Sequence, residues 1–213
     1  MGRRTVLLAA LEKPRLTPKD IDLTVISYAH GDHSQTYDLF MLVHKSERIY
    51  AYHQHENDLA TPACTGVMID HHPDLQKVEE GYEIQPGVQL IHTPGHSPGS
   101  MSVMVETDSG LAAVSGDVLH YSSVALTRKK PLVFWNDMQA TQSIDRIVET
   151  ADVIYPGHDR PFRIARTSIE YLEPTNLTIM GLTPDEPRVT LENEPRPVWI
   201  MPGIEDQSEA ALN

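Results

Sequence analysis

The stretch that decides the fold is YAHGDH at residues 28–33, which follows the short apolar run LTVIS at residues 23–27. This run is rich in β-branched residues and predicts a buried strand, so YAHGDH is the loop after that strand. The loop carries His30, Asp32 and His33, which are all metal-binding residue types. Within one loop they cannot all reach a single ion without strain. We therefore expect them to be divided between two adjacent metal ions.

Three further predicted strands end at a histidine or an aspartate. VQLIH at residues 88–92 leads into TPGHSPGS with His96, the strand at residues 111–115 leads into Asp117, and VIY at residues 153–155 leads into PGHD with His158. In α/β sheets, ligands gather at the carboxyl ends of strands. We therefore expect these loops to meet at one edge of the fold although they lie far apart in the sequence.

The remaining pattern is that of one α/β domain. Residues 48–52 alternate like a strand, and residues 100–105 and 111–115 predict two strands joined by a turn at residues 107–110. A helix is expected from Asn136 or Asp137 to about Thr150, and Thr17-Pro18 is typical of a helix start. From Pro174 the chain is rich in Pro and Glu, so we divide it into a domain at residues 1–173 and a loosely held tail at residues 174–213.

Charge and composition exclude several classes of partner. The chain of 213 residues has 17 Lys and Arg against 30 Asp and Glu, a formal net charge of −13, which repels nucleic acid. No stretch approaches the roughly 20 apolar residues that a membrane span needs. Cys64 is the single cysteine and no signal-peptide cleavage site follows the first apolar run, so we expect a cytoplasmic protein.

The donor types indicate divalent metal ions. Imidazoles and carboxylates without cysteine suit zinc, iron, manganese or cobalt, of which zinc is our first choice. A carboxylate such as Asp117 is able to bridge two ions about 3.5–4 Å apart. His53 and His55 are also spaced like a metal pair, but nothing else converges on them, so we interpret them as surface residues.

Together, these motifs resemble the metallo-β-lactamase superfamily of metallohydrolases. The resemblance covers roughly residues 16–162, and the helix after Asp137 with ADVIYPGHDRPF at residues 151–162 looks most like the N-acyl-homoserine lactonase branch. It implies an α/β fold, an αββα four-layer sandwich, with a dimetal site at the shared edge of two sheets.

The resemblance also implies roles for the residues. Asp32, His33 and His158 would hold one metal ion, His30 and His96 the other, and Asp117 would bridge the two. Lactonases have a tyrosine a few residues past the bridging aspartate that polarises the substrate carbonyl; Tyr121 matches this position, with His120 as the neighbouring candidate. Asp32 is also placed to shuttle a proton.

The sequence departs from the family pattern at two points. The signature is normally His-x-His-x-Asp-His, and Tyr28 stands at its first position, either as a metal-bound phenolate or as an ordinary core tyrosine. The second metal site is thus short of one imidazole, and we expect it to be partly occupied. The motif also begins early in the chain, so the N-terminal sheet is expected to be shortened, with an exposed face that favours a homodimer.

The leading functional hypothesis is a metal-dependent hydrolase that cleaves a small ester-like bond, first of all a lactone, with metal-bound hydroxide as the nucleophile. A thioesterase of the glyoxalase II kind, or another esterase, is the alternative within enzymes. The alternative from another class is a catalytically impaired metal-binding protein, because Tyr28 replaces a ligand.

Overall fold

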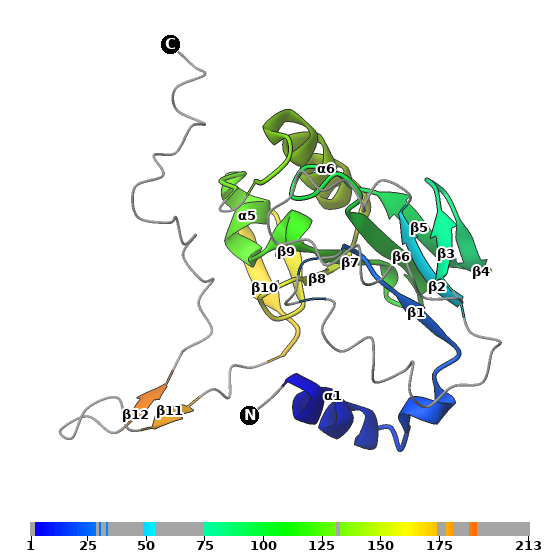
Figure 1. Cartoon of the computed structure of the whole chain (residues 1–213). Coiled ribbons are helices and arrows are strands. Elements are labelled where there is room, and N and C mark those ends of the chain that lie inside the picture. The colour runs from blue at the N-terminus through cyan, green and yellow to red at the C-terminus, as the bar shows by residue number, and fades with distance from the viewer. Residues whose placement is uncertain are drawn as a thin grey trace, which may run out of the picture.

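The computed structural model describes residues 3–28, 30, 33, 49–53, 75–130, 133–173, 178–180 and 188–190. Within these residues the strands form one sheet of seven strands, one of three and one of two. Figure 1 shows the two larger sheets side by side, with the helices α5 and α6 next to the seven-stranded sheet.

The seven-stranded sheet carries most of the described chain. Its order is β10-β9-β8-β7-β6-β5-β4, and its strands are β4 (Glu83–Gln85), β5 (Val88–His92), β6 (Met101–Thr107), β7 (Gly110–Gly116), β8 (Val153–Pro156), β9 (Phe162–Ala165) and β10 (Ser168–Tyr171). Neighbours are antiparallel except β7 and β8, which are parallel. A parallel pair requires a long crossover, and the segment between these two strands contains the helices.

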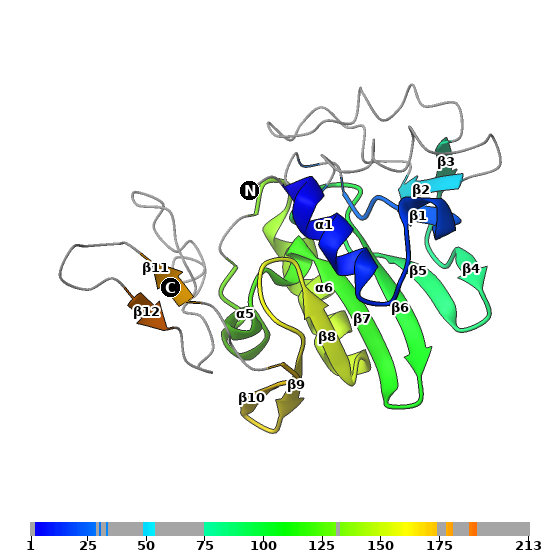
Figure 2. The same cartoon turned by 90° about the horizontal axis from the view of Figure 1, so that it is seen from below.

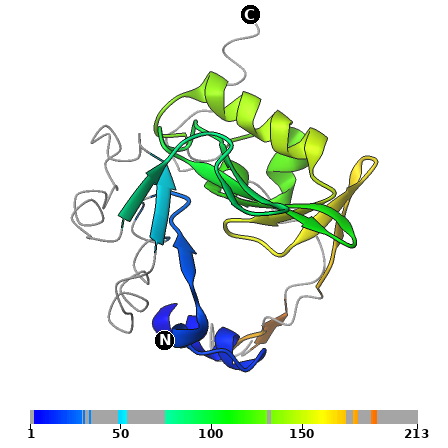
Figure 3. The same cartoon turned by 90° about the vertical axis from the view of Figure 1, so that its right-hand side faces the viewer.

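Three helical elements follow β7. They are the 3-10 turn η2 (Asp117–Leu119), α5 (Ser122–Thr127) and α6 (Asp137–Thr150). The Asn136 side chain caps α6 by accepting a hydrogen bond of 2.9 Å from the backbone N–H of Gln139. Figure 3 shows α6 lying across the seven-stranded sheet, where it buries Ile144 and Ile147.

The main core lies between this sheet and its helices. Its buried members are mostly aliphatic: Ile91, Met104, Ala113, Val118, Leu119, Val124, Ala125, Ile144, Ile147, Ile154 and Phe162. Leu90, next to Ile91 on β5, belongs instead to a smaller cluster with Ile26, Val78 and Met101. Because successive strand residues point to opposite faces, β5 connects the helix side of the sheet to its other side.

The three-stranded sheet packs on part of that other side, over β5 and β6. It is parallel in the order β1-β2-β3, formed by β1 (Leu23–Val25), β2 (Ile49–His53) and β3 (Leu75–Val78). The backbone N–H of Met101 donates a 2.8 Å hydrogen bond to the carbonyl of Ser27, which ties the chain after β1 to β6. This contact holds the loop after β1 at the edge of the larger sheet.

The N-terminal segment precedes these strands as α1 (Arg3–Glu12) and the 3-10 turn η1 (Pro18–Asp20). Thr17 and Asp20 form a capping box, so the start signal was recognised correctly. The helix expected there is nevertheless a single three-residue turn, because Ile21 is already extended towards β1. Helix α1 was not predicted.

Beyond the main body lie β11 (Thr178–Met180) and β12 (Arg188–Thr190), which pair antiparallel. They fall within residues 174–213, the segment expected to be a tail, and lie apart from the two larger sheets in Figures 1 and 2. None of the helices in the described part of the chain has the length and apolar character needed to cross a membrane.

Candidate metal centre

The loops that follow four strands meet at one edge of the fold, as their strand-end positions predicted. Their described polar side chains come from the loops after β1, β5, β7 and β8: His30, His33, His96, Asp117, His120 and His158. The contacts among them divide into two groups that share Asp117.

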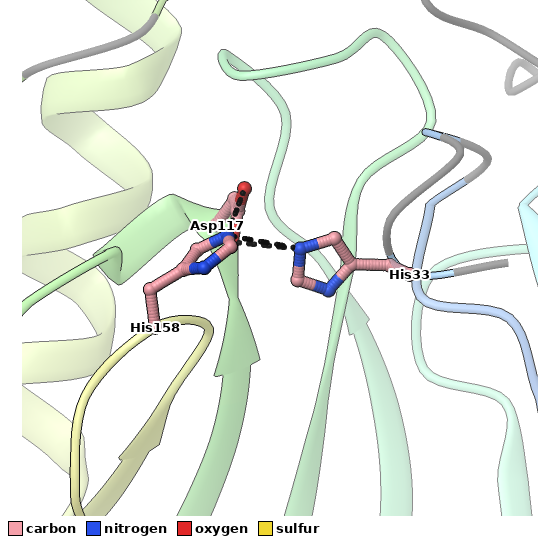
Figure 4. Close-up of side chains that lie close together, drawn as sticks. All are labelled: His33, Asp117 and His158. Atoms are coloured by element: carbon pink, nitrogen blue, oxygen red, sulfur yellow. Dashed lines mark hydrogen bonds and ion pairs between the residues drawn. The ribbon is translucent and has the colours of Figure 1, made fainter. Parts of the chain in front are cut away.

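One group is open to solvent and consists of His33, Asp117 and His158 (Figure 4). The Nε2 atoms of His33 and His158 lie 3.4 and 3.3 Å from Asp117 Oδ1, and 3.1 Å from each other. The two histidine side chains are 18% and 37% exposed. An ion held here is able to meet a substrate from solvent.

The other group is buried and consists of His96, Asp117 and His120, each at most 5% exposed. The Nε2 atoms of His96 and His120 lie 3.6 and 3.2 Å from Asp117 Oδ2. The two imidazole ring centroids are 5.0 Å apart. All three ligand atoms lie within 4.8 Å of one another, so this group could hold one metal ion.

His30 lies beside the buried group. Its Nδ1 atom is 2.9 Å from His96 Nε2, and its side chain is buried. Among the described residues, however, the groups that close around Asp117 contain His120 and not His30.

Asp117 is the electrostatic centre of the site. Burial by itself would raise the pKa of its carboxyl group, but hydrogen bonds from His120 and His158 and the nearby charges of His120 and His33 lower that pKa well below its usual value. The carboxylate is therefore ionised and available to cations. Asp117 Oδ1 and His120 Nε2 are both buried without a hydrogen bond of good geometry. Buried polar atoms are normally satisfied, so these two atoms fit a metal ion as their missing partner.

Two glycines shape the space around this carboxylate. A Cβ atom on Gly157 would lie 2.0 Å from Asp117 Oδ1, so only glycine permits this close approach. Gly116 has a φ of 55°, in the region that favours glycine, and turns the chain at the end of β7.

Tyr28 lies among the histidines. It is 1% exposed, and its ring centroid is 5.2 Å from that of His30, 4.5 Å from that of His33 and 5.2 Å from that of His96. Its ring therefore packs against imidazoles on several sides.

The remaining candidates lie at the rim or outside the described residues. Tyr121 is half-buried, with its ring centroid 6.0 Å from that of His120 and 6.4 Å from that of His158. Asp32 and His55 lie outside the described residues, and His53 is described only as part of β2.

Sequence reasoning did not place Phe134 in the site. Its ring centroid lies 5.4 Å from that of His30 and 5.3 Å from that of His96, and the side chain is 42% exposed. The local signal for this position is the apolar pair Phe134-Trp135 after the basic run at residues 128–130, a pattern that fits either a packed segment or an apolar substrate wall.

Known proteins resemble this chain in sequence over most of its length. The family model described as "Metallo-beta-lactamase superfamily" matches residues 1–158. An N-acyl homoserine lactonase of a Bacillus species is 30% identical over 160 residues, which covers 70% of this chain and 60% of the lactonase. Metallo-beta-lactamase domain-containing protein 1 of Mus musculus is 30% identical over 178 residues, covering 80% and 60%. The chain thus spans about 60% of the length of these relatives.

Solved structures show the same fold. A structure of an N-acyl homoserine lactone hydrolase, with the product N-hexanoyl-L-homoserine bound at its catalytic metal centre, has a TM-score of 0.60 and 26% identity, covering 75% of this chain and 64% of that one. A dizinc quorum-quenching lactonase, at 14% identity and a TM-score of 0.59, covers 80% and 70%. The matches confirm the fold class that the motifs implied.

Proposed function

Because the chain belongs to the metallo-β-lactamase superfamily, we propose that it is a metal-dependent hydrolase that opens a lactone. The observation that carries this proposal is the pair of His/Asp groups sharing Asp117 at the edge of the fold. Imidazole and carboxylate donors at these distances suit divalent cations. The lactonase among the relatives and the lactone hydrolase structure support a lactone as the substrate class.

The chain's own residues divide into two sets of ligands. His33, Asp117 and His158 hold one ion, with Asp32 from the same loop as His33 as a further ligand. His96 and Asp117 hold the other, with His30 beside them. These residues would hold two divalent ions, of which zinc is our first choice, and the ions would supply Lewis acidity that activates water as the nucleophile.

Other side chains orient the substrate. We assign to Tyr121, whose ring lies near those of His120 and His158, the role of donating a hydrogen bond to the lactone carbonyl, where negative charge develops in the transition state. Phe134 offers an apolar wall next to His30 and His96, against which an aliphatic part of a substrate can pack. Asp32 accepts the proton that the nucleophile gives up and passes it to the leaving alkoxide.

The basic residues near the site favour an uncharged substrate over an anionic thioester. Arg128 pairs with Asp145 at 2.7 Å, and Lys130 pairs with Asp137 at 2.9 Å. The guanidinium of Arg160 lies 3.6 Å from the ring centroid of Tyr171. These cations already have partners, so an anionic thiol conjugate would compete with existing pairs.

A substrate panel tests the proposal. The purified protein, with its metal content measured, is assayed on N-acyl homoserine lactones, a glutathione thioester, a β-lactam and a phosphodiester. We expect lactone opening at the highest kcat/KM. Tyr121→Phe should lower kcat more than it raises KM, because its hydrogen bond strengthens in the transition state. Rapid thioester hydrolysis with lactones untouched would replace this proposal with the thioesterase alternative.

We also propose that the chain forms a homodimer through the free face of its larger sheet. Val114 on β7 and Tyr155 on β8 lie opposite each other in register and are 44% and 42% exposed. Burying such an apolar pair against a second copy removes it from water. Sedimentation at micromolar concentration should find a dimer that Val114→Lys shifts to monomer; a monomeric unaltered protein would contradict this.

A further inference from the structure

The buried group has an unexpected composition. Where the family signature begins with a histidine, this chain has Tyr28. A tyrosine binds a metal ion only as a phenolate, and its unperturbed pKa of about 10 makes it a weaker ligand at neutral pH than imidazole. By the family pattern alone, the second ion has one imidazole too few.

His120 lies next to Asp117, the carboxylate that the two groups share. Its Nε2 atom is 3.2 Å from Asp117 Oδ2, and it closes a group with His96 in which all ligand atoms lie within 4.8 Å. A cavity of about 10 Å³ borders these side chains, with His96, Asp117 and His120 among its lining residues. This volume is about that of one water-sized sphere.

The position of His120 is fixed by the backbone. Its carbonyl accepts a 2.9 Å hydrogen bond from the N–H of His158, and the N–H of Gly157 donates to Leu119 at 3.0 Å. These bonds tie the end of η2 to the loop after β8, which carries the exposed group. His120 is thus held with its ring next to Asp117 and is not free to swing to solvent.

Beside these distances, the surroundings of the His120 Nε2 atom are a second indication that this side chain faces a cation. The atom is buried, with the residue 3% exposed, and its polar neighbour is Asp117 Oδ2 at 3.2 Å, a contact without good hydrogen-bond geometry. Buried polar atoms are normally well satisfied, so a cation between this imidazole and the carboxylate would complete the contacts of both groups.

We propose that His120 is a metal ligand that supplies the imidazole missing at position 28. The second ion is then held by His96, Asp117 and His120 together with His30, whose Nδ1 atom lies 2.9 Å from His96 Nε2, while Tyr28 packs against the rings as a core residue. The inference rests on the metal centre of the proposed function, and it replaces the expectation of partial occupancy with two firmly held ions. It concerns metal binding alone and is independent of the substrate.

The test compares the two candidates for the missing ligand. Metal-depleted protein is titrated with Co²⁺, and the stoichiometry and d–d absorption are recorded for the unaltered chain, His120→Asn, Tyr28→Phe and the control His53→Ala. We expect two ions in the unaltered protein, Tyr28→Phe and His53→Ala, and one in His120→Asn. Two ions in His120→Asn, with the second lost in Tyr28→Phe, would overturn the proposal in favour of a phenolate ligand.

A rescue variant and a measurement on the unaltered protein distinguish the loss of a ligand from misfolding. Tyr28→His combined with His120→Asn should recover the second ion, whereas a loss caused by misfolding would persist. If His120→Asn does not fold, the unaltered protein loaded with zinc is measured by ¹⁵N-histidine NMR. We expect the metal-bound imidazoles to be those of His30, His33, His96 and His158 and, in addition, that of His120. A count limited to the first four would overturn the proposal. Lactone turnover does not enter these readouts, so they separate failure of this inference from failure of the proposed substrate.

Discussion

The two groups around Asp117 use the same donor types but differ in their surroundings. His33 and His158 are partly exposed, whereas His96 and His120 are buried. Electrostatic interactions are stronger where water is excluded, so the buried group should hold its ion more firmly. The exposed group is where a substrate can approach. The comparison shows one carboxylate shared by an accessible donor group and a shielded donor group.

The difference arises from what covers each group. The buried group faces α6 and the Phe134 segment: the backbone N–H groups of Phe134 and Trp135 donate to the carbonyls of His96 and Gly95, both at 3.3 Å. Gly95 packs so closely on Ala140 of α6 that a Cβ atom would lie 2.3 Å from its Cα. His33 and His158 lack such cover on their side chains, which are 18% and 37% exposed.

The largest expected effect comes from removing Asp117, the carboxylate that the two groups share. Asp117→Ala should abolish binding at both sites and lower hydrolysis by orders of magnitude, because both groups close around this carboxylate. Metal content per chain and kcat/KM are the measurements. His53→Ala serves as the control and should change neither value. Equal losses in the two variants would show that the ligand assignment is wrong.

A smaller but more specific effect should follow from crowding the carboxylate without removing any donor. Gly157→Ala places a Cβ atom 2.0 Å from Asp117 Oδ1, so Asp117 must shift. We expect weakened binding at both sites and a stability loss of about 1–3 kcal/mol, the usual cost of overpacking.

The matched control for that variant is Gly81→Ala. Gly81 has a φ of 81°, so alanine there costs about 1–3 kcal/mol through strain, but its nearest neighbour is 3.7 Å away. Both variants should lose stability as measured by urea unfolding, but only Gly157→Ala should lose metal. Loss of metal from Gly81→Ala as well would mean that general destabilisation, and not the position of Asp117, explains the result.

The two groups should release their metal ions to a chelator at different rates. With excess chelator we expect two phases, the faster from the group of His33 and His158 because its ligands are exposed. If reaching the buried ion requires about 1.4 kcal/mol of local opening, its release is roughly tenfold slower. Stopped-flow absorption of the cobalt form measures both rates. A single phase for both ions would show that the two groups do not differ in accessibility.

The smallest expected effect is a loss of stability when an ion pair near the buried group is removed. Glu80 accepts a 2.5 Å hydrogen bond from the backbone N–H of His92 and pairs with Arg146 of α6 at 2.7 Å, just before the loop that carries His96. Burial would raise the pKa of Glu80, but the Arg146 hydrogen bond and charge and the His92 hydrogen bond lower it overall. Both partners of the ion pair are nearly half exposed, so Glu80→Gln should cost about 0.2–1 kcal/mol.

The pH dependence of that loss has a definite sign. A carboxyl group with a lowered folded-state pKa stabilises the fold above its unfolded pKa of about 4.3, and this contribution disappears as the pH falls. The difference in unfolding free energy between the unaltered protein and Glu80→Gln should therefore be full at pH 7 and shrink below about pH 4. A difference that grows on acidification would mean that Glu80 does not act as an ionised partner.

Much of the scaffold was predictable because its signals are local. The strand at residues 88–92 was predicted with its observed bounds, and of the two candidate caps, Asn136 and Asp137, the structure has Asn136 as the cap of α6. The strands β7 and β8 and the turn between β6 and β7 were found within a few residues. Alternation, capping side chains and turn residues act over a few positions, so the sequence displays them directly.

What the sequence determined by itself is which residue types stand at the ends of the strands, and hence that a His/Asp centre forms at one edge. What only the tertiary structure decided is which of these side chains face one another. His120 was one of two adjacent candidates for contacting a substrate, but the turn after β7 and its hydrogen bond to His158 place its ring against Asp117. Likewise, Phe134 reaches His30 and His96 because its segment is bonded to the loop of His96. The physical reason is that the direction of a loop side chain depends on backbone contacts with distant segments, and no local pattern encodes them.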